Sequence, residues 1–296
     1  MKIKRILKNI IRDSLRFILP KLWYIKIRFY LTHGYKLNLD NPKTWNEKIQ
    51  YRKLNCDNEY LSKFVDKLTV REYVKEIIGE EYLIPLLEYY EKITPEDLEK
   101  LPNAFVIKTS NGGGGENVKV INDKSKEDFN DICKRFNREL NSKAAMQSDE
   151  LAYTIQKPHI IIEKLILDEN GEIPSDYKFQ VFNQKDKIDF YIQVDKGRFT
   201  NHQRSYFDSD FNKIDLKVQP KYKFIDKKLV KPKNYEEMVE VVEKLSKDFS
   251  YVRIDIYNID GKIYFGEFTF CHGSGWEKIE PQEWDYKMGK LWELKK

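Results

Sequence analysis

A lysine followed by a run of glycines is the feature of this sequence with the clearest chemical potential. Lys108 precedes Thr-Ser-Asn and then four glycines, Gly112, Gly113, Gly114 and Gly115. Glycines adopt backbone conformations that other residues avoid, and their N–H groups can wrap phosphate oxygens. A strand-like segment follows, and the lysine comes before the glycines, which excludes a Walker loop. We expect a hairpin tip that covers a phosphate; the alternative is a mobile hairpin without a ligand.

Two later segments are expected to bring acidic side chains together. Arg253 and Asp255 fall on one face of a predicted strand, and Glu267 and Thr269 fall on one face of the next. The Asp-Gly turn between them predicts a hairpin with Asp255 near Glu267. Two carboxylates among apolar residues suit Mg²⁺, which takes few protein oxygens and also binds substrate phosphates. The alternative is a surface ladder of charged pairs.

Other polar residues stand at the ends of predicted strands. The apolar segment 160–167 contains Glu163 and Lys164, while Asp176 and Lys178 open the following strand. A further cluster gathers cations and amides that suit an anionic substrate or a phosphoryl group, with a solvated loop as the alternative. Its members are Arg198, Asn201, His202 and Arg204.

Three other features carry less information. Asp208 and Asp210 form a D-x-D motif, the metal motif of many glycosyltransferases, but a match in a chain this rich in aspartate is expected by chance. The four histidines show no metal-binding spacing. Cys271 and His272 are adjacent in a strand-like segment, so their side chains should face opposite ways rather than form a nucleophile pair.

Composition narrows the class of protein. The 296 residues are 41% hydrophobic and 34% charged, which predicts a folded protein of about two domains or one large domain. No window approaches 18 apolar residues without charge, which argues against a membrane span. The 53 Lys and Arg residues exceed the 48 Asp and Glu residues too slightly to indicate nucleic-acid binding. Three widely spaced cysteines predict a reducing compartment.

Periodicity and turn signals predict the elements that must position these residues. Residues 40–80 should be helical, with Thr44 and Glu47 forming a capping box and a second helical stretch over 61–78. A linker between Pro85 and Pro102 should contain a short acidic helix from Thr94. Further helices are expected over 125–141 and 235–249, and strands over 104–110, 118–122, 160–167, 177–183, 187–194, 252–258 and 262–270.

The N-terminal segment is strongly basic and amphipathic. Residues 1–30 carry nine Lys and Arg residues and one acid, Asp13, around a repeating apolar face. The charges interrupt every apolar stretch, which excludes a signal peptide. Two interpretations stay open: a helix docked on its own domain, and a helix lying on an anionic membrane surface.

The order of these motifs resembles the ATP-grasp superfamily and, more closely, its TupA-like family, found with genes for surface polysaccharides. The resemblance covers most of residues 40–290 and includes the segments 41–50, 66–74, 79–86, 105–115, 176–182, 198–210 and 252–275. It implies an α/β (α+β) protein with the ATP-grasp fold, in which two subdomains hold the nucleotide. The implied division is 1–38 (basic helical segment), 39–103 (helices and linker), 104–165 (small subdomain) and 166–296 (metal-binding subdomain).

The resemblance also implies a role for individual residues. Catalytic roles fall on Arg253, Arg198 and Lys178. ATP would be bound by Lys67, Lys108, Gly112, Gly113, Gly114, Gly115, Glu163, Lys164, Leu165 and Asp176, with adenine held largely through the backbone of 163–165 and Asp168 as a competitor for the ribose role of Asp176. Substrate contacts fall on Asn201, Arg204, Gly273, Ser274 and Gly275. Mg²⁺ would be held by Asp255, Glu267 and Thr269, although many relatives have Asn at the Thr269 position.

The implied activity is an ATP-dependent ligase that joins a carboxylate to an amine through an acyl phosphate. The implied substrates are a carboxylated sugar or glycan precursor and an amine or amino acid, with ATP and Mg²⁺ as cofactors. The implied location is the cytoplasm, with residues 1–30 a candidate contact to the inner face of the plasma membrane and no nucleic-acid partner. The alternatives are a sugar kinase of the same fold, a glycosyltransferase using Asp208 and Asp210, and a non-catalytic assembly protein.

Overall fold

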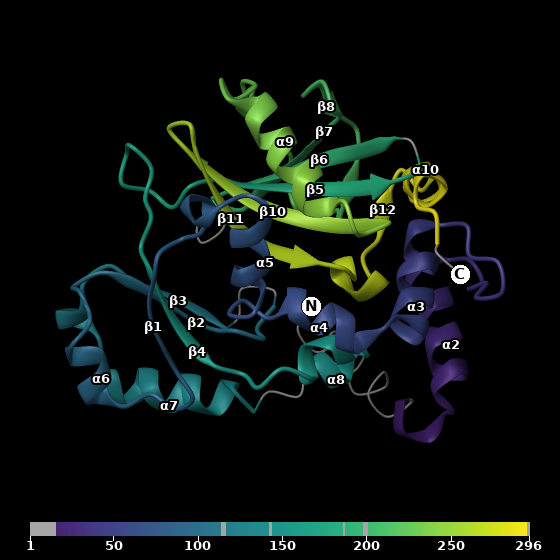
Figure 1. Ribbon diagram of the computed structural model, residues 1–296. Helices are drawn as coiled ribbons and strands as arrows, with labels where there is room; N and C mark the ends of the chain where they lie inside the picture. The colour runs from purple at the N-terminus through teal and green to yellow at the C-terminus, as the bar shows by residue number, and fades with distance from the viewer. Residues whose placement is uncertain (1–15, 114–116, 142–143, 186, 198–200, 295–296) are drawn as a thin grey trace.

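Two antiparallel sheets dominate the molecule, a small one below a large one (Figure 1). The computed structural model describes residues 16–113, 117–141, 144–185, 187–197 and 201–294. The strands in that part of the chain are β1 (Leu86–Tyr90), β2 (Phe105–Thr109), β3 (Val118–Ile121), β4 (Ile160–Lys164), β5 (Asp176–Asn183), β6 (Ile188–Lys196), β7 (Gln203–Phe207), β8 (Lys213–Ile214), β9 (Lys217–Val218), β10 (Tyr251–Ile259), β11 (Lys262–Thr269) and β12 (Ile279–Glu280).

The small sheet has the order β1-β4-β2-β3. Its apolar side chains pack with α6 (Pro95–Glu99) and α7 (Phe129–Glu139), which cover its outer side (Figure 1). The cluster includes the fully buried Phe105, Ile107, Phe136 and Ile160. β2 and β3 form the expected hairpin with Lys108 opposite Val118, so the glycine segment lies at the tip of this sheet.

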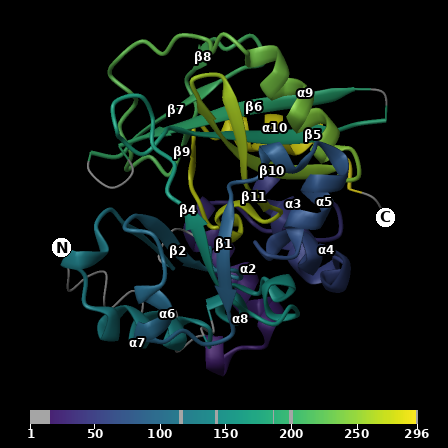
Figure 2. The same ribbon diagram turned by 60° about the vertical axis from the view of Figure 1, so that its left-hand side comes forward.

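The large sheet has the order β11-β10-β5-β6-β7-β8 and two chemically different faces. Because side chains alternate along each strand, Phe179, Ile192 and Ile254 join an apolar core with α9 (Tyr235–Ser246). The opposite face is polar and looks toward the small sheet in the turned view (Figure 2). Register places Lys178 beside both Asp255 and Gln193, and Asp255 beside Glu267. The sheet therefore presents a row of charged residues to the space between the two sheets.

Short helices brace this arrangement. The expected capping box is confirmed, since the Thr44 side chain accepts from the Glu47 amide and starts α3. Helix α10 packs across the start of α3, and only a glycine fits there, because a Cβ on Gly289 would stand 2.2 Å from the Lys43 carbonyl oxygen. The helices are α2 (Lys21–His33), α3 (Trp45–Asn55), α4 (Asn58–Val65), α5 (Val70–Ile77), α8 (Ala144–Ser148) and α10 (Glu283–Leu291), with short 3₁₀ turns η1 (Glu80–Tyr82), η2 (Lys124–Lys126), η3 (Leu151–Thr154) and η4 (His272–Gly275).

Several expectations for residues 39–103 are wrong in detail. The helical stretch expected over 61–78 is broken at Asp66, whose carboxylate accepts from the amides of Leu68 and Thr69 and starts a new helix. The expected linker contains β1, which pairs with β4 as an edge of the small sheet. The small sheet therefore includes residues from Leu86 onward.

The basic segment lies only partly within the described residues. Its first half, residues 1–15, lies outside them, and its second half contains α2. Helix α2 docks through Tyr24, Ile25 and Phe29, so a helix packed on its own domain is confirmed for this half. Among the described helices, none has the length and apolar character needed to cross a bilayer.

Candidate active site

A cavity of about 640 Å³ lies against the polar face of the large sheet. The hairpin tip of the small sheet borders it through Asn111, Gly113 and Asn117. The sheet contributes Lys178, Gln193, Asp195, Arg204, Arg253, Glu267 and Thr269, and the rest of the wall includes Glu150, Tyr153, His202, Gln219, Tyr222, Cys271, His272, Gly273, Ser274 and Glu277.

Six ionised residues form one alternating chain beside this cavity. Lys178 contacts Asp176 at 3.5 Å and also contacts Asp255. Arg253 donates to Asp255 through Nε at 2.6 Å and to Glu267 through Nη2 at 2.8 Å. Glu267 also lies 3.6 Å from Lys67 Nζ. We call this set, Asp176–Lys178–Asp255–Arg253–Glu267–Lys67, the charge chain.

Burial and the neighbouring carboxylates shift the pKa values of two cations in the charge chain. Burial alone would lower the pKa of Arg253, but the carboxylates of Asp255 and Glu267 outweigh it and raise that pKa. Burial lowers the pKa of Lys67, an effect that Glu267 opposes. Unpaired charges in such a place would be costly, so the alternating arrangement of opposite charges holds both carboxylates in place.

The carboxylates of the charge chain fit a magnesium ion that arrives with phosphate groups. The described residues contain no group of three or more His, Cys, Asp and Glu side chains placed to hold a metal. Asp255 and Glu267 stand opposite each other, and Thr269 stands opposite Arg253 on the same face. Two carboxylates and a hydroxyl are too few for a protein-only site, but Mg²⁺ commonly takes its other ligands from phosphates and water.

A β-bulge sets the direction of Glu267. Asp255 pairs with Glu267, but Ile256 pairs with Phe265, which leaves Gly266 as the extra residue. A Cβ on Gly266 would lie 3.0 Å from the Asp255 carbonyl oxygen, so glycine permits this close approach. Bulges of this kind re-aim a neighbouring side chain and are frequent at active sites.

Two lysines connect the small sheet to this region. Lys67 donates its amide to the Ser110 carbonyl at 2.9 Å and its ammonium to the Gly112 carbonyl, so it joins the start of the glycine segment to Glu267. Lys108 contacts Glu163 at 2.6 Å. Glu163 is buried and also lies 3.7 Å from Arg71. Lys67 thus reaches the glycine segment, whereas the Lys108 ammonium is held at Glu163, and neither lysine is part of the cavity wall.

The residues predicted to hold adenine lie at the end of β4. Lys164 donates its backbone N–H to the Pro85 carbonyl at 2.9 Å, so this amide is used within the protein. The Glu163 side chain is used by Lys108, and Leu165 follows directly after the strand. Asp176 is buried and paired with Lys178 instead of lining the cavity, and its competitor Asp168 accepts from the amides of Asn170 and Glu172 in a turn.

Arg204 lies on the cavity wall, as its predicted substrate role requires, and its charge is paired there. Its guanidinium donates to Asp195 at 2.7 Å and lies 4.5 Å from the centre of the Tyr222 ring. His202 also contacts Asp195, at 2.8 Å. Burial would raise the pKa of Asp195, but the His202 hydrogen bond and the Arg204 charge outweigh it and lower that pKa. Arg204 therefore borders the cavity while its guanidinium is paired with Asp195 and packed against Tyr222.

The Gly-Ser-Gly segment forms a tight turn at the opposite wall. Gly273, Ser274 and Gly275 all have positive φ, an uncommon conformation for serine. Gln50 donates to the Ser274 carbonyl at 2.9 Å, and Lys53 donates to the same oxygen at 3.0 Å. The Ser274 hydroxyl donates to Glu150, so the turn presents a hydroxyl and a carboxylate to the cavity.

Three buried groups on this wall have shifted pKa values. Burial raises the pKa of Glu150, against opposing effects of Ser274 and Lys53. Burial lowers the pKa of Lys53 to about 8. Burial also raises the pKa of Cys271, which favours the neutral thiol.

The remaining predicted residues divide into three groups. Gly112, Gly113, Gly273 and Ser274 lie at or near the cavity, whereas Gly275 faces α3, because a Cβ there would meet Gln50 at 2.6 Å. Asn201 is exposed and is not part of the wall. Gly114, Gly115 and Arg198 lie outside the described residues.

The D-x-D motif is part of a turn. The Asp208 carboxylate accepts from the amides of Asp210 and Asn212, at 3.1 and 2.8 Å, in the hairpin between β7 and β8. Neither aspartate lines the cavity. The geometry therefore gives no support to a glycosyltransferase that would use Asp208 and Asp210 to hold a metal.

This combination, a glycine-tipped small sheet facing a carboxylate-bearing large sheet, agrees with a family assignment from the sequence. The model of the TupA-like ATP-grasp family matches residues 47–293. The chain belongs to the TupA-like ATP-grasp family. The comparison of this TupA-like protein with curated proteins finds no match.

Three solved structures are among those to which this chain is similar. D-alanine–D-alanine ligase from Helicobacter pylori is 17% identical, with a TM-score of 0.41, 79% of this chain covered and 62% of that one. N5-carboxyaminoimidazole synthetase from Staphylococcus aureus, complexed with ADP, is 15% identical, with a TM-score of 0.44 and coverages of 84% and 59%. Biotin carboxylase from Campylobacter jejuni is 15% identical, with a TM-score of 0.42 and coverages of 80% and 48%. The TupA-like protein thus spans about half to three fifths of these chains.

Sequence reasoning missed much of the cavity wall. Gln193 and Asp195 carried a usable signal, because they alternate with the apolar Ile192 and Val194 on a predicted strand. Glu150 carried none, since it lies in an irregular segment and reaches the cavity only through the tertiary fold.

Proposed function

We propose that this protein is an ATP-dependent carboxylate–amine ligase that works through an acyl phosphate. The observation that carries the proposal is the charge chain, which lies beside a cavity that the glycine segment also borders. Such an arrangement suits in-line phosphoryl transfer, which depends on positioning and charge neutralisation more than on covalent help from the protein.

The proposed reaction has two steps. A carboxylate oxygen attacks the γ-phosphorus of ATP, the bond to the bridging oxygen breaks, and ADP leaves. An amine nitrogen then attacks the acyl carbon, phosphate leaves, and the amine gives up a proton. Lys67 and Lys108 would bind phosphate oxygens, and Arg253 would steady the charge that develops on the acyl phosphate. Asp255, Glu267 and Thr269 would hold Mg²⁺, which neutralises phosphate charge when bound.

We further propose that the carboxylate belongs to a sugar acid or glycan precursor of a bacterial surface polysaccharide, such as a capsule or a teichuronopeptide, and that the amine is an amino acid or a simple amine. The reaction would occur in the cytoplasm, where ATP is available. The support is family membership together with the polar far wall, where the Tyr222 ring lies beside Gln219, Asp195 and Glu277. Aromatic rings beside planar polar groups suit a hydroxylated ring.

The test is to incubate the purified protein with ATP, Mg²⁺, pooled sugar acids and pooled amines. We expect ADP and phosphate release that requires both pools, together with a product whose mass equals an amide. A stable phosphorylated acceptor formed without any amine would instead establish the sugar kinase, and AMP release would contradict the acyl-phosphate route.

The substitution Lys108→Ala tests whether this lysine binds ATP as proposed. A charge-assisted contact to phosphate is worth enough that its loss should weaken ATP binding about tenfold to a hundredfold. Glu163 keeps Arg71 as a partner, so the fold should persist. Lys119→Ala is the control, because Lys119 lies on the next strand and pairs with Glu127. Equal ATP affinity of Lys108→Ala and the wild type in calorimetric titration would contradict the assignment.

A further inference from the structure

Helix α2 has two apolar faces, and only one of them is used by the fold. Tyr24, Ile25 and Phe29 are buried and form a small core with residues that include Tyr35 and Trp276. Arg28 lies over the Trp276 ring, 3.9 Å from its centre. This face explains how α2 is held on the molecule, but it leaves the other side of the helix without a partner among the described residues.

The opposite side is also hydrophobic. Trp23 is 65% exposed, Tyr30 53% and Leu31 67%. At about 100° per residue, Trp23 and Tyr30 point away from the buried face, and Leu31 lies at its margin. We call this surface the outer α2 face. It consists of exposed residues on the helix, Leu22, Trp23, Ile27, Tyr30 and Leu31, together with Phe17 and Ile18, which are exposed just before the helix begins. An exposed apolar surface on the order of several hundred Å² usually marks an interaction site.

The outer α2 face carries positive charge and no acid. No acid occurs between Asp13 and Asp40. Among the cations of this stretch, Arg16 and Lys21 pair with Asp149 and Arg28 lies over the Trp276 ring, whereas Lys26 is exposed within the face itself. A second copy of the chain docked symmetrically here would bring Lys26 toward its own copy, which is unfavourable. An anionic surface with an apolar interior would satisfy both the charges and the hydrophobic side chains.

The length of α2 and the distribution of its apolar side chains determine how the helix would contact a membrane. The 13 residues of α2 span about 20 Å, too short for a bilayer core of about 30 Å. Its apolar side chains run along its whole length, and Trp and Tyr favour the boundary between water and lipid. The fold and the charge pattern together therefore favour a helix lying in the plane of the interface.

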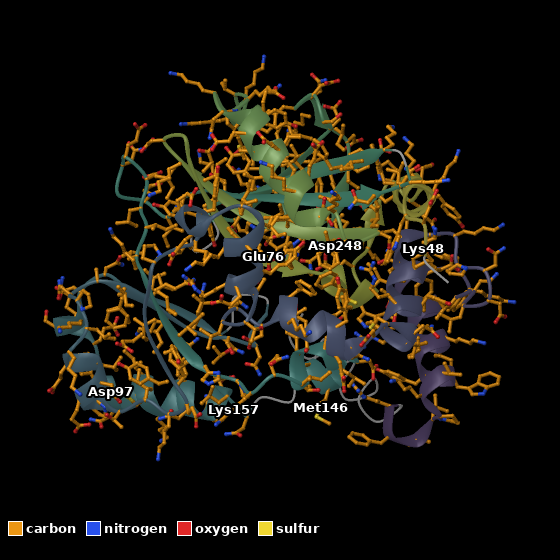
Figure 3. All side chains as sticks on the ribbon, viewed as in Figure 1. Lys48, Glu76, Asp97, Met146, Lys157 and Asp248 are labelled. Atoms are coloured by element: carbon orange, nitrogen blue, oxygen red, sulfur yellow. The ribbon has the colours of Figure 1, made fainter. Side chains whose placement is uncertain are left out.

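We propose that the outer α2 face binds an anionic lipid bilayer, with α2 lying parallel to the membrane surface. Salt bridges fix the orientation of the rest of the molecule, because Arg16 and Lys21 both pair with Asp149, next to Glu150. Met146, labelled in Figure 3, lies in α8 at the lower edge of the view, and its carbonyl accepts from Arg16 at 2.7 Å.

A second contact connects α2 to the cavity. The imidazole of His33, at the end of α2, makes a hydrogen bond with the Gly275 carbonyl at 3.0 Å. The Gly-Ser-Gly turn that lines one wall of the cavity is thus attached directly to the proposed membrane helix. The bilayer would hold this wall close to the surface, where a lipid-attached substrate could reach it. Membrane binding itself does not depend on the proposed function.

The experiment is co-sedimentation of the full chain with vesicles of phosphatidylcholine, with and without phosphatidylglycerol. The wild type should bind the anionic vesicles, bind less as salt rises, and bind pure phosphatidylcholine weakly. The triple variant Trp23→Ser, Tyr30→Ser and Leu31→Ser should lose about tenfold to a hundredfold in partitioning. The control variant Tyr89→Ser, Leu167→Ser and Val230→Ser changes exposed hydrophobic residues elsewhere and should bind normally.

Tryptophan fluorescence locates the contact. Vesicle binding should shift the emission to shorter wavelength, and Trp23→Phe should abolish that shift while sedimentation persists. Unchanged sedimentation of the triple variant would overturn the proposal and assign binding to residues 1–15. If the wild type forms dimers and does not bind vesicles, and the triple variant is monomeric, the proposal is overturned in favour of a second copy of the chain. A thermal melt confirms that the variants are folded.

Discussion

Asp255 and Glu267 share Arg253 as a partner, and this sharing makes their roles interdependent. If both also hold one magnesium ion, removing either should remove most of what the pair contributes to MgATP binding. We expect Asp255→Asn and Glu267→Gln each to weaken MgATP binding about tenfold or more, with little further loss in the double variant. Calorimetric titration of the three variants measures this. Losses that add in free energy would mean that the two carboxylates act independently.

Lys53 should give the folded protein a measurable pH dependence. Its ammonium is buried, and its pKa falls to about 8 in the folded protein from an ordinary value of 10.5. Between these pH values the unfolded chain holds a proton that the folded protein has released, so the free energy of unfolding rises with pH. Relative to Lys53→Met, the wild type should gain about 2 kcal/mol from about pH 7.5 to about pH 9.5.

Urea denaturation of both proteins at the two pH values provides the measurement. Other titrating groups are common to the two proteins and cancel in the comparison. Parallel changes with pH would show that Lys53 keeps an ordinary pKa. The conservative variant Lys53→Arg should lack the rise as well, because a guanidinium does not titrate in this range.

The partner of a single residue can be predicted from the sequence when one local element, such as a hairpin, contains both residues. The pairing of Asp255 with Glu267 followed from period two and a hairpin turn, and the structure has that register. The pairing of Arg204 with Asp195 did not follow, because it depends on the register of β6 with β7. The pairing of this cation is a tertiary property, so sequence alone could not reveal it.

The glycine segment permits a sharp test at the scale of elements. A Cβ on Gly112 would lie 2.6 Å from the Thr109 hydroxyl and 2.8 Å from Asn117 Cβ, whereas one on Gly113 would meet nothing within 4 Å. Gly112→Ala should therefore distort the turn that accepts from Lys67, and it should weaken ATP binding about tenfold. Gly113→Ala is the matched control and should bind ATP normally. Equal effects of both substitutions would show that general flexibility, not the turn, matters.

Elements with local signals were predicted well, and those fixed by distant partners were not. The capping box of α3 and the β10–β11 hairpin depend on neighbouring residues. Strand β1 depends on β4, more than 70 residues away, and reads locally as a linker. The break at Asp66 depends in part on Ser110, whose hydroxyl donates to Asp66 at 2.5 Å. Local periodicity could not reveal either partner.

At the scale of the whole molecule, Lys67 joins the glycine segment of the small sheet to Glu267 of the large sheet. A nucleotide bound at this junction should therefore stabilise both sheets together. When the nucleotide is present at about 100 times its Kd, binding should add about 2.7 kcal/mol to the free energy of unfolding. This should raise the melting temperature by about 5 °C. Hydrogen exchange should slow in β2–β3 and in β10–β11. Protection confined to one sheet would contradict a site between them.

The charge chain has a consequence for the order in which ligands arrive. Its three carboxylates and three cations balance, so the resting protein already supplies every counterion that its acids need. A bare magnesium ion would enter beside Lys178 and Arg253 with no new negative charge to offset its own. A magnesium ion carried by a triphosphate would bring that charge with it. Titration with magnesium chloride alone should therefore give negligible heat, and the metal should enter this protein only as part of the nucleotide.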